Sequence, residues 1–171
     1  MAEHRAERRL TAILAADIVG YSRLMAADEA GTLAALKTHR SEVFEPKAAD
    51  YHGRVVKLMG DGTLMEFGSV VDAVAFAIDV QRTLARRNAD VPESRLIAYR
   101  IGINIGDIIV DGEDIYGDGV NVAARLEALA SPGGICISGG VHDQVKRKLD
   151  GIQRHPDPQF SLELHSRTLR R

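Results

Sequence analysis

The sequence predicts a mixed α/β (α+β) fold in one domain, with elements in the order β-α-β-β-α-β and a C-terminal βαβα-type extension. Two observations support this prediction. Apolar runs of strand length alternate with segments whose apolar residues recur at helical spacing. A Met-Gly-Asp-Gly turn signal joins two of the apolar runs, which predicts a β-hairpin in the middle of the order. At 171 residues the chain is long enough for a single substantial core.

The first predicted elements are a buried strand, a long helix and the hairpin. Residues 7–18 are apolar enough for a strand that is buried on both faces. Residues 28–49 predict a helix, because apolar residues recur at helical spacing from Leu33 to Phe44. The hairpin follows at residues 54–67.

The second half of the chain begins with a helix and continues with shorter elements. Ser69, with Asp72 three residues later, is typical of a capped helix start. The later elements are a strand at 99–110, a loop at 111–119, a helix at 120–130, a strand at 135–138 and a helix at 141–149. Together the predicted elements follow the ferredoxin-like supersecondary pattern, with the extension after it.

Composition and charge exclude several functional classes. The net charge is −2, so no broad basic field is available for nucleic acid or an anionic membrane. The apolar run at residues 11–16 is too short for a signal-peptide core or a membrane span. Cys136 is the only cysteine, which excludes a disulfide framework and a thiolate zinc site. These features are typical of a protein of the reducing cytoplasm.

Two aspartates are predicted to converge at one end of the sheet. Asp17 ends the first strand, and Asp61 lies at the tip of the hairpin. In the ferredoxin-like pattern this tip lies at the same end of the sheet as the end of the first strand. Carboxylate oxygens are hard ligands that suit Mg²⁺ or Mn²⁺, and substrate phosphates can complete the coordination. We therefore predict a divalent-metal site at Asp17 and Asp61.

The segment after Asp17 is a candidate phosphate-binding turn. Its backbone N–H groups and one hydroxyl can donate to phosphate oxygens. It consists of Ile18, Val19, Gly20, Tyr21 and Ser22. Two other phosphate-binding motifs are absent from the sequence, since there is no GxxxxGK[ST] loop and no GxGxxG after a strand.

Lys57 cannot belong to the same site as Asp61. Four extended residues separate the two by about 13 Å along the strand. Lys57 is therefore either a solvated strand lysine or part of a second pocket.

Asn121 and Arg125 lie one turn apart on the predicted helix at 120–130 and share one face of it. An arginine on such a helix is solvated or ion-paired in most proteins. The Gly-rich acidic loop before this helix and the nearby Asn121 favour recognition of ribose and phosphate instead. Another face of the helix is expected to pack on the core. That face consists of Val122, Leu126 and Leu129.

Over residues 9–150 the chain resembles the class III nucleotidyl cyclases, the catalytic domain of adenylate and guanylate cyclases. Three motifs carry the resemblance: DIVGYS at 17–22, KLMGD at 57–61 and DIYGDGVNVAARLE at 114–127. The resemblance implies the class III cyclase catalytic fold, with ATP as substrate and cyclic AMP and pyrophosphate as products.

The resemblance also implies roles for the candidate residues. It implies that Asp17 and Asp61 bind two ions per site, Mg²⁺ or Mn²⁺. Lys57 and Asp114 match the pair that reads adenine in adenylate cyclases, where guanylate cyclases carry Glu and Cys.

Asn121 and Arg125 match catalytic residues that orient the ribose and stabilise charge at the α-phosphate. Family members work as head-to-tail homodimers with two sites at the interface. Each site takes its metal carboxylates from one subunit and the other four residues from the partner. The resemblance thus implies that Lys57 and Asp61 serve different active sites.

From these observations we expect residues 1–151 to form the catalytic domain and residues 152–171 to be a divergent or disordered tail. Family members usually carry a phosphate-binding lysine near their C-terminal end, and nothing in this tail matches that stretch. The expected function is that of an adenylate cyclase. Its alternatives are a guanylate cyclase or a cyclase that uses both purines, and a catalytically silent nucleotide-binding regulatory domain. Further domains in a longer parent protein are compatible with the resemblance.

Overall fold

The computed structural model describes residues 6–59, 61–152 and 162–163. Its strands are β1 (Glu7–Ile18), β2 (Gly53–Met59), β3 (Gly62–Phe67), β4 (Tyr99–Asp111), β5 (Asp114–Tyr116), β6 (Ile135–Ile137) and β7 (Leu162–Glu163). Its helices are α1 (Tyr21–Ala27), α2 (Glu29–His39), α3 (Glu45–Asp50), α4 (Val70–Asn88), α5 (Asp118–Leu129) and α6 (Gly139–Ile152). A π-helical turn spans Arg40–Phe44, and a 3-10 turn spans Glu93–Arg95.

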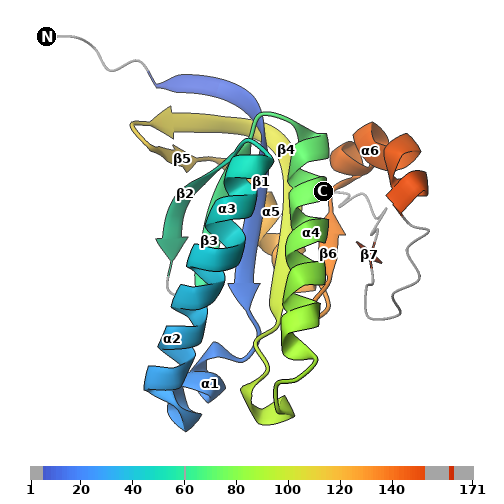
Figure 1. The fold of residues 1–171 in the computed structure, drawn as a ribbon. Coiled ribbons are helices and arrows are strands. Elements are labelled where there is room, and N and C mark those ends of the chain that lie inside the picture. Colours follow the sequence, from blue (N-terminus) through green and yellow to red (C-terminus); the bar gives the residue numbers. More distant parts are fainter. Residues whose placement is uncertain (1–5, 60, 153–161, 164–171) are drawn as a thin grey trace, which may run out of the picture.

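The described strands form one sheet in the order β2-β3-β1-β4-β6-β7, and β5 pairs with β4 outside this path (Figure 1). The four strands β2, β3, β1 and β4 are antiparallel to their neighbours. This arrangement confirms the predicted βαββαβ core. β6 then joins the edge of β4 in parallel, as expected for the C-terminal extension. β5 is a short strand inside the segment predicted to be a loop at 111–119.

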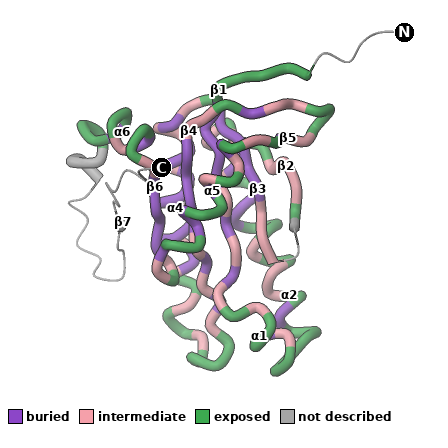
Figure 2. Tube along the Cα trace, turned by 180° about the vertical axis from the view of Figure 1, so that it is seen from behind, coloured by how far each residue is buried: buried purple, intermediate pink, exposed green. Residues whose placement is uncertain are grey.

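Helices cover both faces of the sheet. The helices α2, α3 and α4 lie on one face, and α5 lies on the other (Figure 1). Buried residues are concentrated along the central strands and the inner side of α4 (Figure 2). β1 alternates between the two sides, because Leu14 belongs to the cluster under α4 while Ile13 belongs to the cluster under α5. The prediction that this strand is buried on both faces holds for residues 11–18, where every residue is buried or half-buried, whereas residues 7–10 at its start are exposed.

The helix predicted at 28–49 forms as a continuous helical run from Glu29 to Asp50 that contains one π-helical turn. Asp28 caps α2 by accepting a hydrogen bond from the Gly31 N–H at 3.0 Å. α2 ends at His39, the π-helical turn follows, and α3 begins at Glu45. The turn places Val43 and Phe44 in the core. Pro46, which has no N–H to donate, lies directly after this π-helical turn, in the first turn of α3. The short helix α1 was not predicted from the sequence.

α5 packs unusually close to the sheet. A Cβ atom at Gly102 of β4 would overlap backbone atoms of Glu127 and Ala123. At the start of the helix, a Cβ at Gly119 would lie 2.9 Å from Ile13 Cδ1 and 3.0 Å from the Asp107 carbonyl oxygen. Close approach of this kind requires glycine, because any other side chain would push the helix away.

The close packing corrects the predicted inner face of α5. Leu126 is buried as predicted and Val122 is half-buried, but Leu129 is 54% exposed. Small residues set the inner face, because they let the helix backbone approach β4. The buried residues of this face are Gly119, Ala123, Leu126 and Glu127, and Ala130, which directly follows the helix, is buried as well.

We expect Gly102→Ala to destabilise the domain strongly, because the added methyl group meets helix backbone that cannot move aside. Overpacking of this kind typically costs about 1–3 kcal/mol or more. Gly68→Ala is the matched control, since a Cβ there meets nothing within 4 Å. Chemical denaturation of both variants measures the difference. If the two variants had equal free energies of unfolding, the close contact between α5 and Gly102 would not contribute to stability.

The boundary predicted at residue 151 lies next to the end of α6, at Ile152. Leu162 and Glu163 of the expected tail form β7, in parallel with Ile135 and Cys136 of β6. The rest of the tail, at 153–161 and 164–171, lies outside the described residues. None of the helices in the described ranges has the length and apolar character that a membrane crossing requires.

Candidate active site

The two predicted metal ligands converge. Asp17 pairs with Gly62 in the register between β1 and β3, and Asp61 directly precedes Gly62. The carboxyl groups of two residues 44 positions apart are thus brought to one end of the sheet, as the predicted topology requires. Both residues are partly exposed, so a ligand can reach them.

Two further charged side chains belong to this cluster, and neither was predicted from the sequence. Arg100 of β4 pairs with Asp17 on the other side of β1. Glu127 reaches the cluster from α5 and is only 8% exposed. Its surroundings raise the pKa of Glu127 to about 8, first through burial and then through a hydrogen bond and charge repulsion from Asp17. Burial and the neighbouring Asp17 therefore both favour the protonated form of Glu127.

Three buried atoms in this cluster have no hydrogen-bond partner among the described residues: Asp17 Oδ1, Arg100 Nε and Glu127 Oε1. Buried polar atoms are almost always paired, so several unpaired atoms in one place indicate a missing ligand. A divalent cation at Asp17 and Asp61 would satisfy the carboxylate oxygens. The residues present therefore fit a metal site.

No set of three His, Cys, Asp or Glu side chains in the described ranges is placed to hold a metal ion alone. Asp17 and Asp61 would need further oxygen ligands from water or from a phosphate. Such incomplete protein coordination is usual for Mg²⁺ sites that also bind substrate phosphates.

The predicted phosphate-binding turn connects β1 to α1. Ile18 ends β1, and Gly20 has a left-handed backbone (φ 67°) that turns the chain into α1. Tyr21 and Ser22 lie in the first turn of that helix, where backbone N–H groups have no helical acceptor. The Val19 N–H donates to the Ala98 carbonyl oxygen at 2.9 Å, so it is not free to donate to a phosphate.

The second pair predicted from the sequence also comes together. Lys57 Nζ lies 3.0 Å from Asp114 Oδ1 and 3.3 Å from Asp114 Oδ2. Tyr116, which sequence reasoning missed, completes the group. Its ring centroid is 5.1 Å from Lys57 Nζ, within cation–π range. Hydrogen bonds from Tyr116 and then from Lys57 lower the pKa of Asp114, so this carboxylate stays charged.

Asn121 and Arg125 are exposed on α5, one turn apart as predicted. Glu127 on the same helix points into the cluster of Asp17 and Arg100 and is buried. α5 therefore presents one face to the candidate metal site of its own chain and another to the outside.

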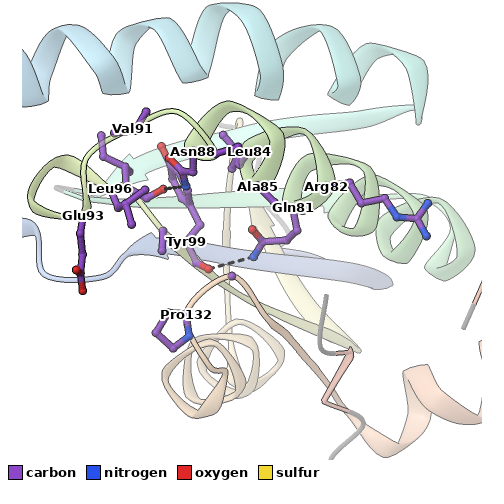
Figure 3. Close-up of a pocket in the computed structure, with 14 residues that line it drawn as sticks. Gln81, Arg82, Leu84, Ala85, Asn88, Val91, Glu93, Leu96, Tyr99 and Pro132 are labelled. Atoms are coloured by element: carbon purple, nitrogen blue, oxygen red, sulfur yellow. Dashed lines mark hydrogen bonds between the residues drawn. The ribbon is translucent and has the colours of Figure 1, made fainter. Parts of the chain in front are cut away.

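Two cavities of the described structure each fail to bring all the candidate residues together. Figure 3 shows a cavity of about 540 Å³ along the C-terminal half of α4, where the Gln81 amide donates to the Tyr99 carbonyl oxygen at 3.0 Å. It contains none of the candidate residues. A second cavity, of about 320 Å³, reaches Ile18, Tyr21 and Asp61 but not Lys57 or Asp114.

Comparisons with known proteins show the family to which the chain is similar. A family model described as the adenylate and guanylate cyclase catalytic domain matches residues 5–165. A Rhizobium meliloti protein named "Putative adenylate cyclase 3" is 53% identical over 150 residues, which make up 88% of this chain and 26% of that protein. A Streptomyces coelicolor protein named "Adenylate cyclase" is 30% identical over 155 residues, or 86% of this chain and 37% of that protein. The chain thus spans well under half of the length of these relatives.

A solved structure is also similar. The adenylate/guanylate cyclase/hydrolase from Silicibacter pomeroyi has a TM-score of 0.80 and 48% sequence identity, and the match covers 84% of each chain.

Proposed function

The chain belongs to the adenylate and guanylate cyclase catalytic domain family, and we propose that it is an adenylate cyclase, which converts ATP to 3′,5′-cyclic AMP and pyrophosphate. The observation that supports ATP over GTP is the contact between Lys57 and Asp114 at 3.0 Å. A lysine and an aspartate offer one donor and one acceptor, which complement the N1 acceptor and the N6 amino donor of adenine. Guanine presents the reverse pattern at these positions. The names of the relatives agree with this choice.

Asp17 and Asp61 would hold two ions, Mg²⁺ or Mn²⁺, together with the triphosphate. When bound, such ions acidify the ribose 3′-hydroxyl and neutralise charge on the phosphate oxygens. The first turn of α1, at Tyr21 and Ser22, follows Asp17 closely in the chain and would donate backbone N–H groups to phosphate. Arg100 adds a positive charge next to Asp17.

Asn121 and Arg125 would orient the ribose and stabilise the charge that develops at the α-phosphate. Holding the 3′-hydroxyl in line with the phosphorus supplies much of the remaining rate enhancement. Because these residues are exposed on α5 while Glu127 faces the metal cluster of its own chain, we propose that they act in the site of a second subunit. The assembly is then a head-to-tail homodimer with two shared sites. A cytoplasmic location, where ATP is abundant, is part of the proposal.

The test of this function is cyclic nucleotide formation from ATP and from GTP, with Mg²⁺ and with Mn²⁺, over a range of protein concentrations. We expect ATP to be the preferred substrate and specific activity to rise with protein concentration. Preference for GTP would support a guanylate cyclase. Nucleotide binding without any product, at concentrations where the protein is dimeric, would support a silent regulatory domain.

The double substitution Lys57→Glu with Asp114→Cys should depress ATP turnover and raise the relative use of GTP. Reversing donor and acceptor leaves polar groups unpaired against adenine, which a site of this kind rejects strongly. The ratio of kcat/KM for ATP to that for GTP is the measurement. Arg54→Glu, on the same strand but bonded to Glu66 and to the Glu113 carbonyl oxygen, is the control. An unchanged ratio in the double variant would remove Lys57 and Asp114 from the base pocket.

A further inference from the structure

β2 has an irregularity that determines where Lys57 points. In the register with β3, Val55 lies opposite Met65, and Lys57 lies opposite Leu64. Val56 between them is the extra residue of a β-bulge. Met65 belongs to the core under α4, whereas Leu64 belongs to the core under α5. Because residues paired across two strands share one face of the sheet, the bulge moves the Lys57 side chain from the α4 side to the α5 side.

On β5 the side chains alternate regularly, and this places Tyr116 beside the same lysine. Ile115 is fully buried, so its two neighbours, Asp114 and Tyr116, share the opposite side of the strand. Lys57 Nζ lies 3.0 Å from Asp114 Oδ1 and 5.1 Å from the centroid of the Tyr116 ring. The ammonium group is therefore in contact with a carboxylate and within cation–π range of an aromatic ring at the same time.

Packing in the core does not account for Tyr116, because its side chain is 47% exposed. Lys57 has a long, flexible side chain that is itself 31% exposed, and an ion pair at such a position holds a lysine only weakly. A ring beside the ammonium group restricts the lysine further, to the position from which it contacts Asp114.

We propose that Tyr116 is a positioning residue for purine recognition, which holds the Lys57 ammonium group where it can donate to N1 of adenine. This inference rests on the proposed adenylate cyclase function and deepens it. The ring acts through Lys57, so phenylalanine can replace tyrosine here but leucine cannot. Guanine N1 carries a hydrogen atom and cannot accept from Lys57. A well-placed lysine therefore favours ATP, and a loosely held lysine does not.

The first test measures the binding of 3′-deoxy-ATP and 3′-deoxy-GTP by calorimetry with Mg²⁺. These analogues lack the attacking hydroxyl group, so they bind without being cyclised. Tyr116→Leu should raise the dissociation constant of 3′-deoxy-ATP about 3- to 30-fold and should not raise that of 3′-deoxy-GTP. Tyr116→Phe should bind both analogues like the unmodified protein. Equal losses in Tyr116→Leu and Tyr116→Phe, or no loss in either, would overturn the proposal.

A second Lys-Asp-Tyr group in the chain supplies the matched control. Lys47 Nζ lies 2.9 Å from Asp79 Oδ1, and the Tyr51 hydroxyl donates to Asp79 Oδ2 at 2.9 Å. This group joins α3 to α4 and contains none of the candidate site residues. Tyr51→Leu should lower thermal stability and leave the binding of both analogues unchanged. If it changed the preference between the analogues as much as Tyr116→Leu does, lost stability would explain both effects and the positioning role would be refuted.

A double-mutant cycle tests whether Tyr116 acts through Lys57. In a Lys57→Met background, Tyr116→Leu should not weaken the binding of 3′-deoxy-ATP any further, because no ammonium group is left to position. An equal loss in both backgrounds would mean that the ring contacts the base directly, which contradicts the positioning role.

NMR of ¹³C-lysine-labelled protein separates this inference from the proposed function, because it needs no nucleotide. The ε-methylene protons of Lys57 should show a ring-current shift that persists in Tyr116→Phe and disappears in Tyr116→Leu. Absence of this shift would overturn the inference and leave the proposed function intact. If the shift is present but the unmodified protein binds both analogues equally, the proposed ATP preference is wrong, and the recognition role of Tyr116 is refuted with it.

Discussion

Asp17→Asn is expected to reduce cyclase activity at least about 100-fold, because the metal ions that carry the reaction supply several kcal/mol of transition-state stabilisation and each 1.36 kcal/mol is a factor of ten. The amide is nearly the same shape as the carboxyl group but is a poor ligand for Mg²⁺. Initial rates with ATP and Mn²⁺ measure the effect. Asp90→Asn, at an exposed position after α4, is the control and should keep full activity.

The same substitution should leave the fold intact and keep or raise the melting temperature of the metal-free protein. Asp17 is crowded by Glu127 and Asp61, and one of its buried oxygens has no hydrogen-bond partner in the described structure. Removing a negative charge from such a cluster relieves repulsion. Unfolding of the Asp17→Asn variant, or more than a few per cent of residual turnover, would show that Asp17 is a structural residue rather than a metal ligand.

The placement of the metal ligands could be predicted because it depends on topology. The alternation of strands and helices determines which strand ends lie at the same end of the sheet. The register that pairs Asp17 with Gly62 follows from the hairpin whose turn contains Asp61. Periodicity and a turn signal were therefore sufficient to bring the two aspartates together. The contact between Lys57 and Asp114 follows less directly, because it depends on the short strand β5, which the sequence did not predict.

The residues that were missed are those whose environment comes from tertiary packing. A glutamate beside an exposed arginine on a helix would be assigned to solvent, yet Glu127 is buried while Leu129 is exposed. The cause is Gly102, which lets α5 lie so close to β4 that small residues, rather than large apolar ones, form its inner face. The spacing of apolar residues along α5 does not indicate which residues form this inner face. An unexplained glycine in the middle of a buried strand was the available signal.

Arg100 and Tyr116 were missed for a different reason. Each is an ordinary strand residue whose role depends on its neighbour across the sheet. Arg100 matters because it faces Asp17, and Tyr116 because it reaches Lys57 and Asp114. Pairing partners of this kind can be assigned only after the strand register is known.

Mixing two inactive variants, Asp17→Ala and Arg125→Ala, should restore activity if the sites are shared between subunits. In a mixed dimer both lesions fall in one site, and the second site has Asp17 and Asp61 from one subunit and Asn121 and Arg125 from the other. With random exchange of subunits, half of the dimers are mixed and each has one intact site of two, so about a quarter of the unmodified activity is expected. Each variant alone should be inactive.

The amount of recovered activity distinguishes the shared site from its alternatives. Mixing Asp17→Ala with Asp61→Ala is the control, because both lesions lie in the same half of the site and no mixed dimer contains an intact one. Recovery only in the first mixture, together with a fall in specific activity on dilution, would follow from a site that no single subunit can complete. Subunit exchange demonstrated by mass spectrometry without any recovery would place Asp17 and Arg125 in the same subunit's site. The exposed face of α5 would then need another explanation, because its Asn121–Arg125 pair would have no second subunit to act upon.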